Sequence, residues 1–277
     1  MRIRKRALVS KFYADRGPHL AAMVAYFALL SFVPLTFLAL SLLGLVHRAD
    51  ASDFLIKELR RAFPSSSLTS ILSLVHQVQD NAATLGIIGG VALLWSSLSL
   101  FSALESAFNI VYGLPNRSFL RGKALAATLM VATITTLFAS LVVGAVGVEV
   151  VKRYAPGVAG NSVVAYILSI AVSVVGVFLF LLAVYRLLPT ADVTLRDALP
   201  GAIAASIVLE ASFQVVPVFV RLAAVNPVLR ALGGPAILLL WLYVMANVIV
   251  LGAELNWWRS RRSELRAEQP PPLEGLA

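Results

Sequence analysis

Long stretches of apolar residues, almost free of charged side chains, determine the solvent in which this chain can fold. The first stretch runs from Leu20 to about Val46, and a helix needs about 20 mostly apolar residues to cross the hydrocarbon core of a bilayer. Charged residues make up 13% of the chain and hydrophobic residues 59%, whereas soluble domains carry about 25% charged residues. So few charges cannot cover a water-soluble globule of this size. The sequence therefore predicts a polytopic membrane protein.

The apolar stretches predict six spans. All are expected to be helical, because only helices and closed barrels satisfy the backbone in lipid and no strand alternation is visible. The predicted spans cover residues 20–46, 83–111, 124–148, 163–187, 198–222 and 232–256. We expect helix kinks at Pro34, in the first span, and at Pro217, in the fifth, because proline removes one helical hydrogen bond. The predicted fold class is an all-α membrane helix bundle.

The sequence divides into three regions. Residues 1–19 form a basic N-terminal segment, 20–258 the membrane domain, and 259–277 a tail that we expect to be disordered. Within 47–82, apolar residues recur at helical spacing, which predicts short amphipathic helices at the outer membrane surface. The stretch from Leu20 is about twice as long as the apolar core of a signal peptide, about 7–15 residues, so we expect it to remain as a span.

Basic residues predict the orientation. With the N-terminus inside, the cytoplasmic segments hold fifteen of the 23 Lys and Arg residues, and such an excess is typical of cytoplasmic loops. We therefore expect a bacterial inner-membrane protein with both termini in the cytoplasm. The same rule accounts for the net charge of +9, so no nucleic-acid partner is expected.

Polar residues follow one helical face in two of the spans. They are Glu210, Gln214, Pro217 and Arg221 in the fifth span, and Tyr243, Asn247 and Glu254 in the sixth. At 1.5 Å per residue, Glu210 lies about 18 Å into its span and Asn247 about 13 Å. We expect these two to meet if the fifth and sixth spans are neighbours. Polar groups inside a span usually pair or line a path, so these residues form a candidate polar path.

A third polar stripe lies in the second span, where Asn109 follows three serines and Glu105 lies beside them. Glu105 and Glu254 are expected near the cytoplasmic boundary, where Arg117, Arg121 and Arg259 are the expected partners. Glu254 has two interpretations: a packing contact with a basic residue, or part of a cytoplasmic gate or proton site. For Glu210 the alternatives are a structural pair and a mechanistic carboxyl group.

Two connections between spans are similar in sequence. "YGLPNRSFLRGKAL" (112–125) and "YRLLPTADVTLRDAL" (185–199) both run from Tyr through Leu-Pro and Leu-Arg into a new span. Parallel repeats occur in transporters. Proline after a helix and arginine at the inner boundary are also generic helix-ending signals, so the similarity has both interpretations.

The sequence shows no catalytic set. It has no cysteine, and its histidines (His19, His47 and His76) lie outside the predicted spans or at their edges. None of them lies in a zinc-hydrolase motif, and there is neither a nucleophile elbow nor a phosphate-binding loop. We expect no catalytic residue, no metal and no cofactor, and the chain is not expected to be an enzyme.

Four segments carry a resemblance to a known family. They are "AYFALLSFVPL" (25–35), "LWSSLSLFSALESAFNIVYG" (94–113), "YRLLPTADVTLRDALPGAIAA" (185–205) and "LLLWLYVMANVIVLGAELN" (238–256). From about Leu20 to Trp257 the chain resembles the YihY/BrkB family of bacterial inner-membrane proteins, once labelled ribonuclease BN. The resemblance implies six helices and cytoplasmic termini, and it implies no settled substrate. The chain has no histidine or carboxylate cluster that would support the ribonuclease label.

The first functional hypothesis is a non-enzymatic transporter or flippase-like protein for a lipid, a lipid-linked sugar or a small anion. Its path would lie among the second, fifth and sixth spans, with Glu210 central. The second hypothesis is a structural or regulatory scaffold of the envelope, and the third a membrane-embedded lipid enzyme. Membrane lipids are the expected partners, and a homo-oligomer or envelope protein partners remain open.

Overall fold

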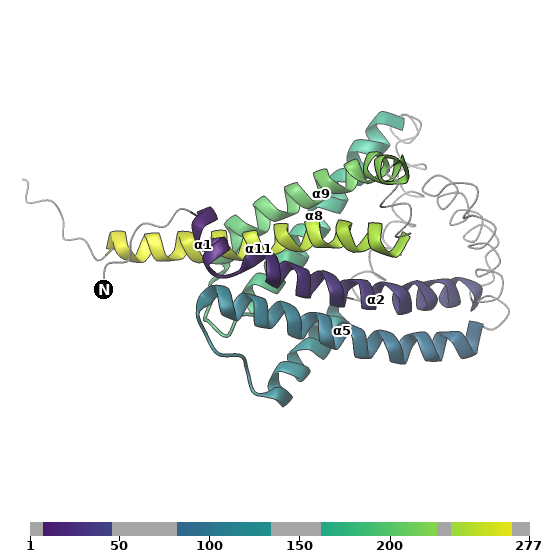
Figure 1. The fold of residues 1–277 in the computed structure, drawn as a ribbon, viewed down its shortest axis with the longest axis horizontal. Coiled ribbons are helices and arrows are strands. Elements are labelled where there is room, and N and C mark those ends of the chain that lie inside the picture. The colour runs from purple at the N-terminus through teal and green to yellow at the C-terminus, as the bar shows by residue number, and fades with distance from the viewer. Residues whose placement is uncertain (1–7, 46–81, 134–161, 226–233, 268–277) are drawn as a thin grey trace, which may run out of the picture.

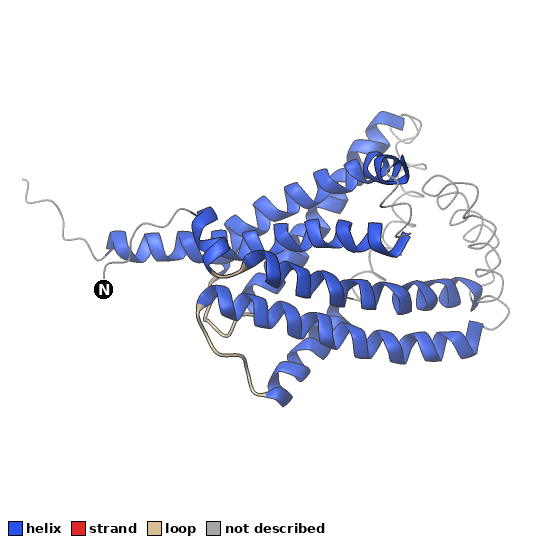
Figure 2. Ribbon diagram, in the orientation of Figure 1, coloured by secondary structure: helices blue, strands red, loops and turns tan. Residues whose placement is uncertain are grey.

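The computed structural model describes residues 8–45, 82–133, 162–225 and 234–267, and within these ranges every regular element is a helix (Figure 2). The helices are α1 (Leu8–Ala14), α2 (Gly17–Leu45), α5 (Ala82–Tyr112), α8 (Ser162–Leu187), α9 (Leu195–Val225) and α11 (Gly234–Ala267). A further helix is described over 119–133. The all-α prediction is confirmed for these ranges.

Three of these helices are long and apolar enough to cross a membrane: Gly90–Tyr112 in α5, Leu195–Val215 in α9 and Gly234–Arg261 in α11. They match the second, fifth and sixth predicted spans. The first and fourth correspond to shorter apolar helices, Gly17–Phe32 and Ser173–Leu187. The predicted number of six spans is therefore not confirmed.

Several predictions fall wholly or partly outside the described residues. Most of the predicted span 124–148 and all of 47–82 except Ala82, the first residue of α5, lie there. The tail that was expected to be disordered over 259–277 is helical as far as Ala267, because α11 continues to that residue, and 268–277 lie outside the described residues. The N-terminal segment also contains α1, a helix that the sequence analysis did not predict. Both prolines of interest lie inside helices, since α2 continues through Pro34 and α9 through Pro217.

Helix α11 runs through the middle of the bundle (Figure 1). It packs against α2, α9, α5 and α1, while α2 also packs on α5 and α8 on α9. At one end lie α1, the connections 113–118 and 188–194, and the last turns of α11 (Figure 1). We call this the α1 end of the bundle.

The buried core gathers toward the α1 end and is rich in small residues. Ala21, Ala107, Ala198 and Ala202 are all fully buried, which allows helix backbones to approach closely. Farther along α5, large apolar side chains are exposed, with Trp95 at 79%. Exposed apolar side chains on several successive turns of a helix suit contact with lipid.

Local signals fix the helix ends at the α1 end. Gly113, just after α5, has a φ of 69°, the left-handed conformation that commonly ends a helix. Thr194 begins α9 with a capping box: the Asp197 backbone N–H donates to the threonine hydroxyl, which donates to the Asp197 carboxylate at 2.5 Å. Both connections are therefore held in defined conformations.

Candidate functional site

The ammonium group of Lys11 lies buried between α1, α5 and α11. It donates to Glu254 Oε2 at 2.7 Å and to the Val111 carbonyl oxygen at 2.9 Å, and it also pairs with Asp15. The Trp257 ring centroid lies 4.1 Å from Nζ, within range of a cation–π interaction. The three ammonium hydrogens thus have three oxygen acceptors and an aromatic face beside them.

Glu254 is fully buried, and only one of its carboxylate oxygens is satisfied. Its side-chain exposure is 0% and that of Lys11 is 9%. Within the described residues, Glu254 Oε1 has no hydrogen-bond partner. Buried acceptors are usually paired, so an orphaned carboxylate oxygen calls for an explanation.

The turn between α1 and α2 holds Lys11 in place. Arg16 has a φ of 57°, in the left-handed region that residues other than glycine rarely adopt. A Cβ on Gly17 would lie 2.2 Å from the Phe12 ring, so only glycine fits there without a shift. In the sequence, Lys11 is one of the basic residues of the N-terminal segment 1–19, from which only the orientation in the membrane was predicted. The Lys11–Asp15 spacing of one helical turn was the available signal for α1.

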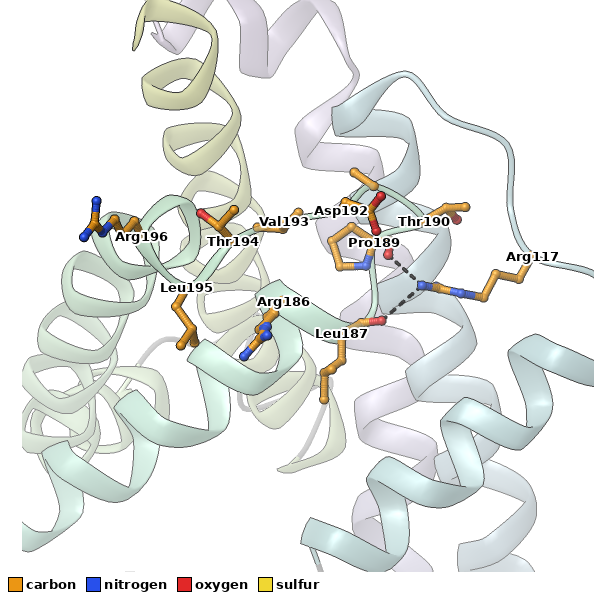
Figure 3. A pocket seen from close by; sticks show the side chains of 11 residues that line it. Arg117, Arg186, Leu187, Pro189, Thr190, Asp192, Val193, Thr194, Leu195 and Arg196 are labelled. Carbon is orange, nitrogen blue, oxygen red and sulfur yellow. Dashed lines mark hydrogen bonds between the residues drawn. The ribbon is translucent and has the colours of Figure 1, made fainter. Parts of the chain in front are cut away.

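Glu105 and Arg117 form a second ion pair at the α1 end. Arg117 Nη1 lies 3.3 Å from Glu105 Oε1, and the Arg117 backbone N–H donates to the same oxygen at 3.3 Å. The guanidinium also donates to the carbonyl oxygens of Leu187, the last residue of α8, and of the two residues that follow it. Figure 3 shows the bonds to Leu187 and Pro189. Arginine thus satisfies carbonyls that a helix C-terminus leaves unpaired.

The prediction of which basic residues pair with Glu105 and Glu254 is therefore partly correct. Arg117 does pair with one of the low acids, Glu105, but Glu254 pairs with Lys11 rather than with Arg117, Arg121 or Arg259. The reason is that α1 folds back against α11 and brings a closer cation.

Asn109 connects the two similar loops. Its Oδ1 accepts the Thr190 backbone N–H at 2.7 Å, and its Nδ2 donates to Asn116 Oδ1 at 3.1 Å. The loops also bond directly, because the Thr190 hydroxyl donates to the Pro115 carbonyl oxygen at 3.1 Å and Arg117 donates to that of Pro189 at 2.7 Å. The segments that look alike in sequence thus lie against each other.

Two glycines mark close helix crossings beside this site. A Cβ on Gly201 of α9 would lie 2.2 Å from the Gly252 carbonyl oxygen of α11, and a Cβ on Gly252 would lie 2.2 Å from the Tyr185 hydroxyl. Asn256 Oδ1 accepts the Gly201 backbone N–H at 2.6 Å. Asn256 was not among the predicted site residues, although it follows Glu254 closely in the same motif.

Glu210 lies inside the bundle, away from the α1 end, and is 7% exposed. Its carboxylate accepts the Ser173 hydroxyl of α8 at 2.7 Å and the Gln214 amide at 3.0 Å. Helices α9 and α11 are neighbours, as the predicted meeting required. Even so, Glu210 and Asn247 share no hydrogen bond in the described part of the chain, because the Asn247 amide donates to the Tyr243 carbonyl oxygen of its own helix at 2.7 Å.

The remaining predicted site residues are placed as follows. The side chains of Pro217 and Arg221 fall outside the described part of the structure, although both residues belong to α9. Pro34 is buried within α2. In the described ranges no group of three or more His, Cys, Asp and Glu residues is placed to hold a metal ion.

A cleft of about 740 Å³ opens beside the 188–194 connection (Figure 3). Arg186 and Arg196, from the end of α8 and the start of α9, line it together with Arg117 and Asp192. A smaller cleft of about 200 Å³ shares Ala191, Asp192 and Val193 with it and extends to Trp257. These clefts give the α1 end a solvent-accessible, charged surface.

The apolar helices, the exposed apolar surface and the few buried ion pairs together define a polytopic helical membrane protein. Residues 8–274 match the family model described as virulence factor BrkB, so the chain belongs to the BrkB family. The resemblance seen in the sequence is thereby confirmed.

The chain is 26% identical over 274 residues to a ribonuclease-like protein of Bacillus subtilis, YfkH, covering 96% of this chain and 98% of that protein. It is 30% identical over 265 residues to a UPF0761 membrane protein of Aromatoleum aromaticum, covering 91% of this chain and 62% of that protein. A UPF0761 membrane protein of Stenotrophomonas maltophilia is 27% identical over 289 residues, covering 98% of this chain and 65% of that relative. The chain thus spans somewhat less than two thirds of these UPF0761 relatives. No solved structure matches it.

Proposed function

We propose that the chain is a non-enzymatic transporter or flippase-like protein of the bacterial inner membrane, for a lipid, a lipid-linked or a small anionic cargo. The observation that carries this proposal is Glu210. It is a buried carboxyl group within the membrane-spanning part of α9, and the hydrogen-bond partners that it has among the described residues, Ser173 and Gln214, are both neutral.

A carboxylate in this position is costly. A charged side chain near the bilayer centre costs about 2.5–3.5 kcal/mol on insertion scales, and such groups usually mark ion paths or proton relays. Neither Ser173 nor Gln214 neutralises the charge. Glu210 is therefore suited to exchanging a proton or a cation during a transport cycle, whereas a purely structural carboxylate would be expected to have a basic partner.

In this proposal the α1 end faces the cytoplasm. Arg117, Arg121, Arg186 and Arg196 gather there, in agreement with the excess of basic residues on the inner side of bacterial membranes. Glu254 would then lie at the cytoplasmic mouth. Glu210 lies fifteen residues beyond the start of α9 at Leu195, or about 22 Å along the helix at 1.5 Å per residue.

The test is flux in proteoliposomes that contain the purified full chain. Uptake and efflux of labelled phospholipids, lipid-linked sugars and small anions are compared for the native protein and Glu210→Gln. We expect the variant to fold, because the amide can still accept from Ser173, and to lose at least tenfold in flux. Ser212→Ala is the matched control, since the Ser212 hydroxyl donates to the Val208 carbonyl oxygen of its own helix and has no other hydrogen bond in the described part of the chain. Full flux in Glu210→Gln would refute the proposed role of Glu210.

A scaffold makes opposite predictions. It tolerates Glu210→Gln and retains stable envelope partners on purification. The "ribonuclease-like" name belongs to the Bacillus subtilis relative, and the proposal for this chain assigns no bond-making or bond-breaking step.

A further inference from the structure

The surroundings of the Lys11 ammonium have the features of a binding site for a cation. On the bundle side, Glu254 Oε2 at 2.7 Å and the Val111 carbonyl oxygen at 2.9 Å face the nitrogen, and the Trp257 ring lies 4.1 Å away. Val111 lies in the last turn of α5, where the helix dipole adds partial negative charge. These three groups belong to the bundle and would remain if α1 moved away.

The donors and acceptors identify the class of cation. A small divalent metal ion takes six or more oxygen ligands and gains nothing from an aromatic ring. A primary ammonium has three N–H donors and is attracted to the face of tryptophan. Lys11 is itself an alkylammonium, and its presence shows that this chemistry fits the site.

Two observations are compatible with replacement of Lys11 by another amine. Glu254 Oε1 is buried without a hydrogen-bond partner in the described part of the chain, so the site has one acceptor more than Lys11 uses. Asp15 pairs with Lys11 from within α1 itself. If α1 left the bundle, Lys11 would keep this counter-ion, and Oε1 could accept the bond that Asp15 accepts now.

We infer that the pocket formed by Glu254, the Val111 carbonyl group and Trp257 binds a primary alkylammonium group, for which Lys11 is the tethered occupant. The site lies at the end of the membrane-spanning part of α11, Gly234–Arg261, the depth at which Trp257 and Trp258 suit the headgroup region. An aminophospholipid headgroup and a small soluble amine both carry this chemistry. The inference deepens the proposed function, on which its biological meaning rests, by naming what binds at the α1 end.

The first experiment is chemical rescue of the full-length Lys11→Ala variant in detergent micelles. We expect its melting temperature to fall by several degrees, and ethylammonium chloride at millimolar concentrations to restore at least half of the loss with saturation. Sodium chloride and tetramethylammonium chloride at equal ionic strength should not restore it, because neither cation donates three hydrogen bonds. Equal recovery with all three salts, or none with ethylammonium, would overturn the inference.

Two control variants make the rescue specific. Lys11→Ala combined with Glu254→Gln should lose the ethylammonium effect, because the carboxylate that pairs with the amine is gone. Arg121→Ala removes an exposed positive charge from the same end of the bundle and should show no ethylammonium effect. A stabilising effect of similar size in either control would identify a non-specific salt effect and refute the site.

The second experiment uses the native site, so that it stands even if Lys11→Ala fails to fold. The chain has no cysteine, so Val9→Cys on α1 and Arg259→Cys on α11, both exposed, can carry two spin labels. We expect a longer-distance population in phosphatidylethanolamine nanodiscs than in phosphatidylcholine nanodiscs if the headgroup is the source. Ethanolamine added to phosphatidylcholine nanodiscs should produce the same population if a soluble amine is the source. Identical distances under all three conditions would overturn the inference.

Each of the two proposals can be refuted without affecting the other. Loss of transport in Glu210→Gln does not depend on amine binding at Glu254. Likewise, an absent ethylammonium rescue leaves the flux measurements intact.

Discussion

Lys11 Nζ lies 2.7 Å from Glu254 Oε2, although the two residues are 243 positions apart in the chain. This contact joins the first described helix to the last. Breaking a buried ion pair from one side leaves an uncompensated charge, which costs about 3–5 kcal/mol. Replacing both partners with neutral residues removes that penalty.

We therefore predict a large coupling in a double-mutant cycle. Lys11→Met should lower the unfolding free energy by about 3 kcal/mol. Glu254→Gln should lower it by less, because Asp15 still pairs with Lys11. The double variant should be more stable than the sum of the single effects predicts. Equilibrium unfolding in detergent micelles measures the cycle, and strict additivity would contradict the pairing.

Arg117 should be essential for joining the two connections. Its guanidinium bonds to Glu105 and to carbonyl oxygens at the end of α8. Since charge-assisted hydrogen bonds contribute about 1.5–3 kcal/mol, Arg117→Ala should lose at least about 2 kcal/mol. Arg117→Lys should recover only a small part, because lysine lacks the planar fork. Arg121→Ala, which removes an exposed side chain close by, should change stability by less than about 0.5 kcal/mol in the same unfolding assay.

Because Gly201 and Gly252 lie at close helix crossings, adding a single methyl group at either position should lower the stability of the protein markedly. Gly201→Ala forces a Cβ against the Gly252 carbonyl oxygen, and overpacking typically costs about 1–3 kcal/mol. Gly252→Ala meets the Tyr185 hydroxyl, so Tyr185→Phe should partly relieve it. Gly176→Ala is the matched control in α8, because nothing lies within 4 Å of its Cβ position. It should be neutral or gain about 0.5–1 kcal/mol from helix propensity. Melting temperatures that fall equally for all three glycines would rule out the close crossings.

Substitution of Asn247 can distinguish a role in transport from a role in stability. Its amide bonds to the Tyr243 carbonyl oxygen of its own helix, and such local bonds contribute little to folding. Asn247→Leu should therefore alter the unfolding free energy by less than about 0.5 kcal/mol. If the polar path of the proposed function includes α11, flux should fall in this variant while the melting temperature stays constant. A large drop in melting temperature would instead assign Asn247 a structural role.

Features that depend on the composition of a single segment could be predicted from the sequence. The apolar length of the stretches around Phe101, Ala202 and Val250 identifies three spans. The depth of Glu105 within its span suggested three arginines as possible partners, and one of them, Arg117, is its partner in the structure. The inward orientation of Glu210 followed from the cost of a carboxylate in lipid.

Other features depend on which helices are neighbours, and no single segment encodes that. One of the two partners of Glu210, Ser173, lies on a helix that the polar-path hypothesis did not include, whereas the other, Gln214, belongs to the predicted path. The partner of Glu254 lies in a segment of basic residues that looked like an ordinary membrane flank. The closeness of Gly201 to Gly252 likewise becomes visible only once α9 and α11 are packed together.

The position of α1 has a consequence for biosynthesis. Lys11 precedes Glu254 by 243 positions, so the ribosome makes α1 long before α11. During that interval Lys11 has Asp15, in its own helix, as a counter-charge but lacks the carboxylate of Glu254. The final docking of α1 therefore has to wait until α11 has been inserted.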